Sequence, residues 1–155
     1  MSYILERDLI NGKQGKAIVE IDGQNHELFH CKKIEAKTTF NKADIKTVGT
    51  TTIQKKPTGQ TKTGTLEMYY GSPYFVELAH VYEKTGKTLY FNLMIENDDP
   101  TTSVGARRIA LYGCSLDEIP LAKLDADADA LDEQLGFSFT SWEILENFHD
   151  PAQLG

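Results

Sequence analysis

The chain contains 155 residues, of which 40% are hydrophobic, and carries a formal net charge of −7. These totals predict one globular domain with a substantial core. They argue against a protein that wraps nucleic acid, because phosphates are neutralised by Lys and Arg. No apolar run is long enough to span a bilayer. Charged residues interrupt the N-terminus where a signal peptide would be apolar, so synthesis in the cytoplasm is expected.

The charge is distributed unevenly along the chain. Residues 1–70 contain 11 Lys and Arg against 8 Asp and Glu, whereas residues 71–155 contain 5 against 15. Complementary fields favour docking, so the basic part of one copy could meet the acidic part of the next. The alternative is that the asymmetry reflects only solvated faces, because charge balance informs association and not fold.

The N-terminal part predicts an arm followed by a β-hairpin. The arm comprises residues 1–14, and its apolar patch consists of Tyr3, Ile4, Leu5, Leu9 and Ile10. Strand-like runs at residues 16–21 and 24–29 flank Asp22-Gly23. This dipeptide between two strands is typical of a type I′ turn.

Residues 32–40 alternate between apolar and polar side chains. One face carries Ile34, Ala36, Thr38 and Phe40, and the other carries Lys33, Glu35, Lys37 and Thr39. This period of two predicts a strand in an antiparallel sheet with one face in water. A turn is expected at Asn41-Lys42, followed by a further strand over residues 43–48.

Residues 49–64, GTTTIQKKPTGQTKTG, include only one large apolar side chain, that of Ile53. A loop of this length inside a compact domain is usually functional or disordered. We predict a projecting hairpin or flap that becomes ordered against a partner. The alternative is a flexible surface loop.

Residues 62–96 predict a strand, a helix and a second strand. β-Branched and aromatic residues at positions 65–70 favour the first strand. Ser72 is a good N-cap, Pro73 suits the first helical position, and Gly86 suits a left-handed stop. The apolar face of the helix comprises Phe75, Leu78, Ala79 and Tyr82. The second strand places on one face Leu89, Phe91, Leu93 and Ile95.

The C-terminal part predicts further strands around an acidic segment. Strands are expected at residues 107–112, 115–124 and 135–142, and DADADALDE at residues 125–133 predicts an acidic turn or a short strand. Residues 143–155 are expected to form a tail with a short amphipathic turn, whose apolar side chains are Ile144, Leu145 and Phe148.

The acidic segment matches the calcium-binding loop of an EF-hand in part. Asp125, Asp127 and Asp129 match the first ligand positions of an EF-hand loop. Positions 6 and 12 of that loop require Gly and Glu, and here they are Ala130 and Gly136. A solvated acidic face is therefore the favoured interpretation.

No other stretch has the complete spacing of a catalytic or cofactor site. Residues 59–64 have the GxxxxG spacing of a phosphate loop but lack the Lys that follows it. His26, His30 and Cys31 lack a fourth metal ligand. Cys31 and Cys114 are expected to be reduced thiols. No Ser or Cys has an assignable base, so we expect no enzyme, no metal and no cofactor.

Antiparallel strands with a polar second face indicate assembly. Unpaired sheet edges tend to join other copies, and head-to-tail joining around an axis closes a ring. A ring with a polar inner wall is a channel. Two other classes remain open: a small-ligand-binding β-barrel, which requires an apolar pocket and a monomeric state, and a hydrolase, which requires a nucleophile–base pair.

The chain carries a series of short motifs along nearly its whole length. They are NGKQG at 11–15, the Asp22-Gly23 hairpin, KIEA at 33–36, the segment from Asn41-Lys42 to Val48-Gly49, KTGT at 62–65, IALY at 109–112, LDAD at 124–127 and FSF at 137–139. In their order and spacing the chain resembles the tail tube proteins of contractile-tail bacteriophages, especially those of PBSX-type prophages and phage-tail-like bacteriocins.

The resemblance implies a mainly β fold, an antiparallel β-sandwich or small barrel with one flanking α-helix. It implies hexameric rings that stack into a hollow tube inside a contractile sheath, for DNA passage or envelope puncture. The implied partners are further copies of the chain, the sheath protein, a baseplate or tube initiator and a tape-measure protein, with DNA only as cargo. An acidic wall suits this role because it repels DNA phosphates. Infectious phage, defective prophage and bacteriocin all remain possible parents.

The resemblance also implies two sets of contact residues. The inter-ring set is Val48, Gly49, Ile53, Lys55, Lys56, Pro57, Gly59, Lys62 and Gly64. The lumen set is Lys33, Glu35, Lys37, Thr39, Asp44 and Lys46, with Tyr90, Met94 and the strand at 137–142 as alternatives. We predict that deleting residues 49–64 leaves a folded monomer that cannot form tubes.

Overall fold

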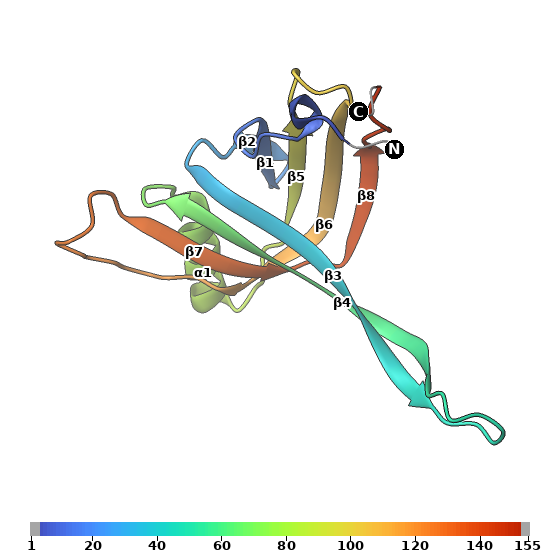
Figure 1. Ribbon diagram of the computed structural model, residues 1–155. Coiled ribbons are helices and arrows are strands. Elements are labelled where there is room, and N and C mark those ends of the chain that lie inside the picture. The colour runs from blue at the N-terminus through green and yellow to red at the C-terminus, as the bar shows by residue number, and fades with distance from the viewer. Residues whose placement is uncertain (1–3, 153–155) are drawn as a thin grey trace.

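A computed structural model describes residues 4–152, which form a mainly antiparallel β structure with one α-helix (Figure 1). The elements in chain order are η1 (Glu6–Asp8), β1 (Gly15–Ile21), β2 (Gln24–Glu27), β3 (Cys31–Ile45), β4 (Gln54–Tyr69), α1 (Tyr74–Thr85), β5 (Phe91–Asp98), β6 (Ala106–Glu118), β7 (Asp132–Ser138) and β8 (Ser141–Glu146). The predicted fold class is confirmed.

The strands follow the order β2-β1-β5-β6-β7-β4-β3, and β8 pairs with β6 outside this path. β6 belongs to both halves of the structure, because residues 106–114 pair with β5 and residues 115–118 pair with β7. Near the end of the first part lies Gly113, whose φ of 66° favours glycine. We call the two halves the β1–β5–β6 sheet and the β3–β4–β7 sheet.

The core lies between the two sheets and α1. Phe75 of α1, Phe91 of β5 and Phe137 of β7 are each at most 2% exposed. The Phe75 and Phe91 ring centroids are 5.4 Å apart and edge to face, and those of Phe91 and Phe137 are 6.4 Å apart. Such aromatic pairs add to the stabilisation from burial alone. One aromatic chain therefore joins the helix to both sheets.

Most predicted features of the helix are confirmed. Gly86 ends α1 with a φ of 70°, and Phe75 and Leu78 are buried. The prediction of Ser72 as N-cap is wrong: Pro73 holds that position, and no side chain caps the helix. Tyr82 was predicted to be apolar core but is 55% exposed, because it lines a groove at the surface.

The long β3–β4 hairpin differs from the prediction in two ways. β3 continues through Asn41 and Lys42, where only the register shifts, so the predicted turn is wrong. Residues 54–64 belong to β4 and are not loop. Backbone hydrogen bonding to the opposite strand can hold a polar, Thr- and Lys-rich sequence in a strand without core contacts. The outer part of the hairpin, residues 40–60, projects beyond the body of the protein, and we call it the arm (Figure 1).

After residue 105, the strands of the structure also differ in their bounds from the predicted strands. The strands predicted at 107–112 and 115–124 are one strand, β6. The strand predicted at 135–142 is two strands, β7 and β8, and residues 143–146 of the predicted tail belong to β8. Their strand conformation depends on pairing with β6, a partner distant in sequence. The rest of the tail up to residue 152 has no regular structure, and residues 153–155 lie outside the described residues.

Two buried aspartates attach the N-terminal segment to the loop after β5. Asp8 accepts hydrogen bonds from the amide and hydroxyl of Ser103 at 2.9 and 2.7 Å. Asp99 accepts from the Asn11 amide at 3.0 Å, and from the Thr101 amide and hydroxyl at 3.0 and 2.7 Å. These hydrogen bonds favour the charged carboxylate, so the pKa of each group lies below its usual 3.8.

Of the predicted apolar patch, Ile4, Leu9 and Ile10 are exposed and Leu5 is half-buried, whereas Tyr3 lies outside the described residues.

The hydrogen bonding of Asp8 and Asp99 predicts a specific loss of stability in acid. A lowered folded pKa stabilises the protein above the unfolded pKa near 3.8, and the stabilisation is lost as pH falls through the folded values. We expect Asp8→Asn/Asp99→Asn to be less stable than wild type at pH 7 and to lose less stability between pH 7 and pH 3. Urea unfolding midpoints at both pH values measure this. Asp22→Asn, in the exposed hairpin turn, should retain the wild-type pH dependence, and an unchanged dependence in the double variant would contradict the assignment.

Candidate assembly surfaces

A polar face crosses the β3–β4–β7 sheet. Register pairs Lys33 with Glu67 and Glu35 with Thr65, and Thr65 in turn with Gly136. The same face continues to β6, where Asp117 accepts a hydrogen bond from the Ser138 hydroxyl at 2.7 Å. Four of the predicted lumen residues lie exposed on it: Lys33, Glu35, Lys37 and Thr39. The opposite face of the sheet faces the core, as Leu66 and Leu135 show.

This polar face is wider than the sequence analysis predicted. Its members outside the predicted set are Thr65, Glu67, Gln134, Ser138 and Asp117. The alternation of Leu66 and Met68 with Thr65 and Glu67 was a usable signal, but the sequence did not show that β4 lies beside β3. Together with Lys32, Lys123 and Asp132, which lie beside it, the face has five carboxylates, Glu35, Glu67, Asp117, Glu118 and Asp132, and four lysines, so its net charge is slightly negative.

The other two predicted lumen residues lie elsewhere. Asp44 is on the arm, and its carboxylate is 3.0 Å from the Lys55 ammonium. Because β3 continues without a turn, alternation places Asp44 on the side of Phe40 and not on that of Lys37. Lys46 is exposed beyond the end of β3. The structure therefore groups Asp44 and Lys46 with the predicted inter-ring residues.

The predicted inter-ring residues lie mainly on the exposed arm. Val48 is fully exposed and Ile53 is 51% exposed at its tip, and Lys56 is exposed nearby. The exposed members also include Gly49, Lys55, Pro57 and Gly59. Phe40, on the face predicted to be apolar and buried, is 60% exposed on the arm. Apolar side chains gathered on a projecting arm indicate a contact surface.

Lys62 and Gly64 differ from the rest of that set. Lys62 is half-buried, and Gly64 is buried in β4 between β3 and β7. A Cβ at Gly64 would collide with the ring of Phe137 and lie 2.8 Å from the Glu35 carbonyl oxygen. Gly64 therefore permits close packing of the sheet on its aromatic core.

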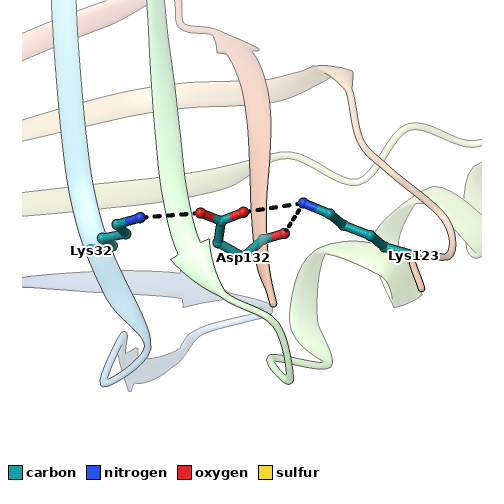
Figure 2. Close-up of polar contacts among 3 residues, drawn as sticks. All are labelled: Lys32, Lys123 and Asp132. Carbon is teal, nitrogen blue, oxygen red and sulfur yellow. Dashed lines mark hydrogen bonds and ion pairs between the residues drawn. The ribbon is translucent and has the colours of Figure 1, made fainter. Parts of the chain in front are cut away.

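An ion-paired triad joins the base of the hairpin to the acidic segment (Figure 2). The Lys32 and Lys123 ammonium groups each lie 3.1 Å from the Asp132 carboxylate, and Lys123 also donates to the Asp132 carbonyl oxygen at 2.9 Å. The hydrogen bonds from Lys32 and Lys123 lower the pKa of Asp132. Sequence reasoning missed this contact, because Lys32 and Asp132 are 100 positions apart.

Three strands have an unpaired edge within residues 4–152. β2 pairs only with β1, β3 only with β4, and β8 only with β6. Every residue of β8 is exposed, including Trp142, Ile144 and Leu145 at 43–50%. Unpaired edges with exposed apolar groups favour pairing with another chain. Of the alternative lumen residues, Tyr90 is exposed and Met94 is half-buried in β5, by the other sheet. The strand predicted at 137–142 is divided between β7, where Ser138 lies on the polar face, and β8.

Over residues 4–152, no group of three or more His, Cys, Asp or Glu is placed to hold a metal ion. Within the same residues, no helix is both long and apolar enough to cross a membrane. Cys31 and Cys114 are free. Burial raises the pKa of Cys114 to about 12, so this thiol stays protonated near neutral pH.

Comparisons with known proteins agree with this arrangement. The family described as "Phage tail tube protein" matches residues 2–146. Phage-like element PBSX protein XkdM of Bacillus subtilis (strain 168) is 33% identical over 144 residues, which cover 93% of this chain and 95% of XkdM.

Two solved structures share the fold. The tube of the SPP1 tail has a TM-score of 0.63 at 9% identity, covering 91% of this chain and 80% of that chain. A chain of the sheath–tube complex of an extracellular contractile injection system, PVC, has a TM-score of 0.65 at 10% identity, covering 88% of this chain and 90% of that chain. From the family match, with the XkdM relationship in support, the chain belongs to the phage tail tube protein family.

Proposed function

We propose that this structural tail tube subunit forms hexameric rings that stack into a hollow tube inside a contractile sheath. The polar face of the β3–β4–β7 sheet would line the lumen, and the arm would contact a neighbouring copy. One observation carries the proposal: the polar face crosses four strands, and its end strand, β3, has an unpaired edge and continues into the arm.

The charge of the polar face supports passage of DNA through the lumen. Its carboxylates outnumber its lysines, so the wall would repel phosphates and leave a duplex free to slide. The chain's own basic residues are concentrated on the arm instead, where residues 42–56 hold four lysines and one aspartate. This distribution favours the arm for protein contacts and the sheet for the lumen.

The further partners follow from the same role. We infer contacts with a sheath protein around the tube, a baseplate or tube initiator at one end and a tape-measure protein within, with assembly in the bacterial cytoplasm into a phage or phage-like tail. Tube, cap and baseplate components of contractile systems share the fold of this chain. A small-ligand-binding barrel is not favoured, because the family match indicates a tube subunit.

Electron microscopy of the purified, concentrated protein tests the proposal. We expect sixfold rings or hollow tubes in negative stain. In tubes, Glu67→Cys should react slowly with a polyethylene-glycol maleimide too large for the lumen, whereas Lys13→Cys, in an exposed turn, should react freely. Equal rates at the two positions would remove the lumen assignment. A monomer under every condition, with a bound small molecule, would instead support the ligand-binding alternative.

A further inference from the structure

A groove with a volume of about 710 Å³ lies between α1 and the end of β6. The residues that line it include the apolar side chains of Leu78, Leu89, Leu116 and Ile119. Leu121 is 68% exposed at its margin. A concave apolar surface of this size, open to water, fits a side chain from another protein.

The charged residues that line the groove are acidic. Its charged lining residues within the described part of the chain are Glu83, Asp117 and Glu118, and none is Lys or Arg. The segment that follows Leu121 contains Lys123, which is paired with Asp132, and then the exposed Asp125, Asp127 and Asp129. A partner for this surface should therefore combine a small apolar group with positive charge.

The tip of the arm has this combination of groups. Val48 and Ile53 present exposed apolar side chains there. Lys46 and Lys56 are exposed beside them, while Lys55 is paired with Asp44. The tip is therefore complementary to the groove in both polarity and charge.

The two surfaces lie on opposite sides of the molecule. Figure 1 shows the arm projecting away from the body, with α1 and the segment between β6 and β7 on the other side. At about 3.3 Å per residue, the part of β3 beyond Thr39 alone extends roughly 20 Å. A copy cannot fold its own tip back into its own groove, so contact requires a second copy. Contacts between two different surfaces generate rings or filaments.

We propose that the acidic groove beside α1 is the acceptor site for the arm tip of a neighbouring copy. This inference rests on the proposed tube function and adds the identity of the receiving surface. Val48 would enter the groove near Leu121, with Lys46 and Lys56 beside Glu83 and Glu118. Throughout the assembly, each such contact would join the basic arm of one copy to the acidic body of the next.

Intermolecular cross-linking locates the contact. Assembled Val48→Cys/Leu121→Cys protein, oxidised and separated without reductant, should give a ladder of covalent oligomers, with the two positions identified in linked peptides by mass spectrometry. Val48→Cys/Leu9→Cys is the matched control, because Leu9 is 58% exposed but lies on the N-terminal segment. Tubes without a 48–121 link would overturn the acceptor site while leaving the tube function standing. A wild-type protein that never assembles would overturn both.

Exchanging the charges of the arm tip and the groove tests whether their attraction stabilises the same contact. Lys46→Glu/Lys56→Glu should raise the critical concentration for assembly at least about tenfold, and so should Glu83→Lys/Glu118→Lys, because like charges would then meet. Combining all four substitutions should restore assembly to near the wild-type level. Lys13→Glu/Lys16→Glu, which has the same charge change as the first variant but lies on another surface, should change it little. Failure of the fourfold variant to recover, while the control assembles, would contradict the pairing.

Discussion

Replacing residues 40–60 by an Asn-Gly turn should abolish tube formation and leave a folded monomer. Thr39 and Thr61 are direct cross-strand partners, so a two-residue type I′ turn can close the shortened hairpin. Within the removed segment only Ala43 is half-buried and every other residue is exposed, so it contributes no core side chain. We expect the circular dichroism spectrum to be retained and Tm to lie within about 5 °C of wild type, while size exclusion and negative-stain microscopy show no rings or tubes.

The structure changes which deletion is informative. Removing residues 49–64, as the sequence suggested, would also remove Thr63 and Gly64, which pair with Ser138 and Phe137 in β7. That deletion should damage the fold as well as the assembly. As a control, serine at Thr50, Thr51 and Thr52 keeps the arm at full length and should still give tubes. Tubes of normal length from the 40–60 replacement would show that the arm is dispensable.

Phe137→Ala should cause the largest loss of stability among single substitutions in this chain. The ring is fully buried, lies between the rings of Phe91 and Phe139, and fills the space above Gly64. Truncating a buried Phe removes both its transfer energy and its packing, at a cost of about 3–5 kcal/mol. Since domains are stable by only about 5–15 kcal/mol, a measurable unfolded fraction is expected. Urea unfolding followed by tryptophan fluorescence measures the change.

The matched control is Phe40→Ala, the same chemical change on the arm. Phe40 is 60% exposed, so its loss should alter the free energy of unfolding by no more than about 0.5 kcal/mol. Gly64→Ala tests the same core contact from the other side, because its Cβ would press on the Phe137 ring and should cost about 1–3 kcal/mol. Equal destabilisation by Phe137→Ala and Phe40→Ala would contradict the described core.

Assembly and folding are separable in this protein. The arm carries exposed groups and no core residues, whereas the aromatic core joins α1 to both sheets without it. Variants of the arm should therefore change tube formation at nearly constant Tm. Variants of Phe137 should lower Tm, with loss of tubes as a consequence.

Features that depend on neighbouring residues could be predicted before the fold was known. Asp22-Gly23 adopts the positive φ values of its turn, Gly86 ends the helix, and residues 33–38 alternate in burial as in a sheet with one wet face. These are choices of backbone conformation and side-chain period, which a few adjacent residues control. The order of short motifs also sufficed for the family, as the match over residues 2–146 shows.

The pairing of strands and the grouping of side chains on one face depend on contacts between distant parts of the chain. Residues 54–64 and 143–146 have no strong local strand signal, and they become strands because a distant edge offers backbone partners. The same pairing buries Gly64 while Ile53 stays exposed, and brings Lys32 to Asp132. Ladder hydrogen bonds are made by the backbone and are nearly independent of side-chain identity. Long-range register therefore leaves little trace in the local sequence.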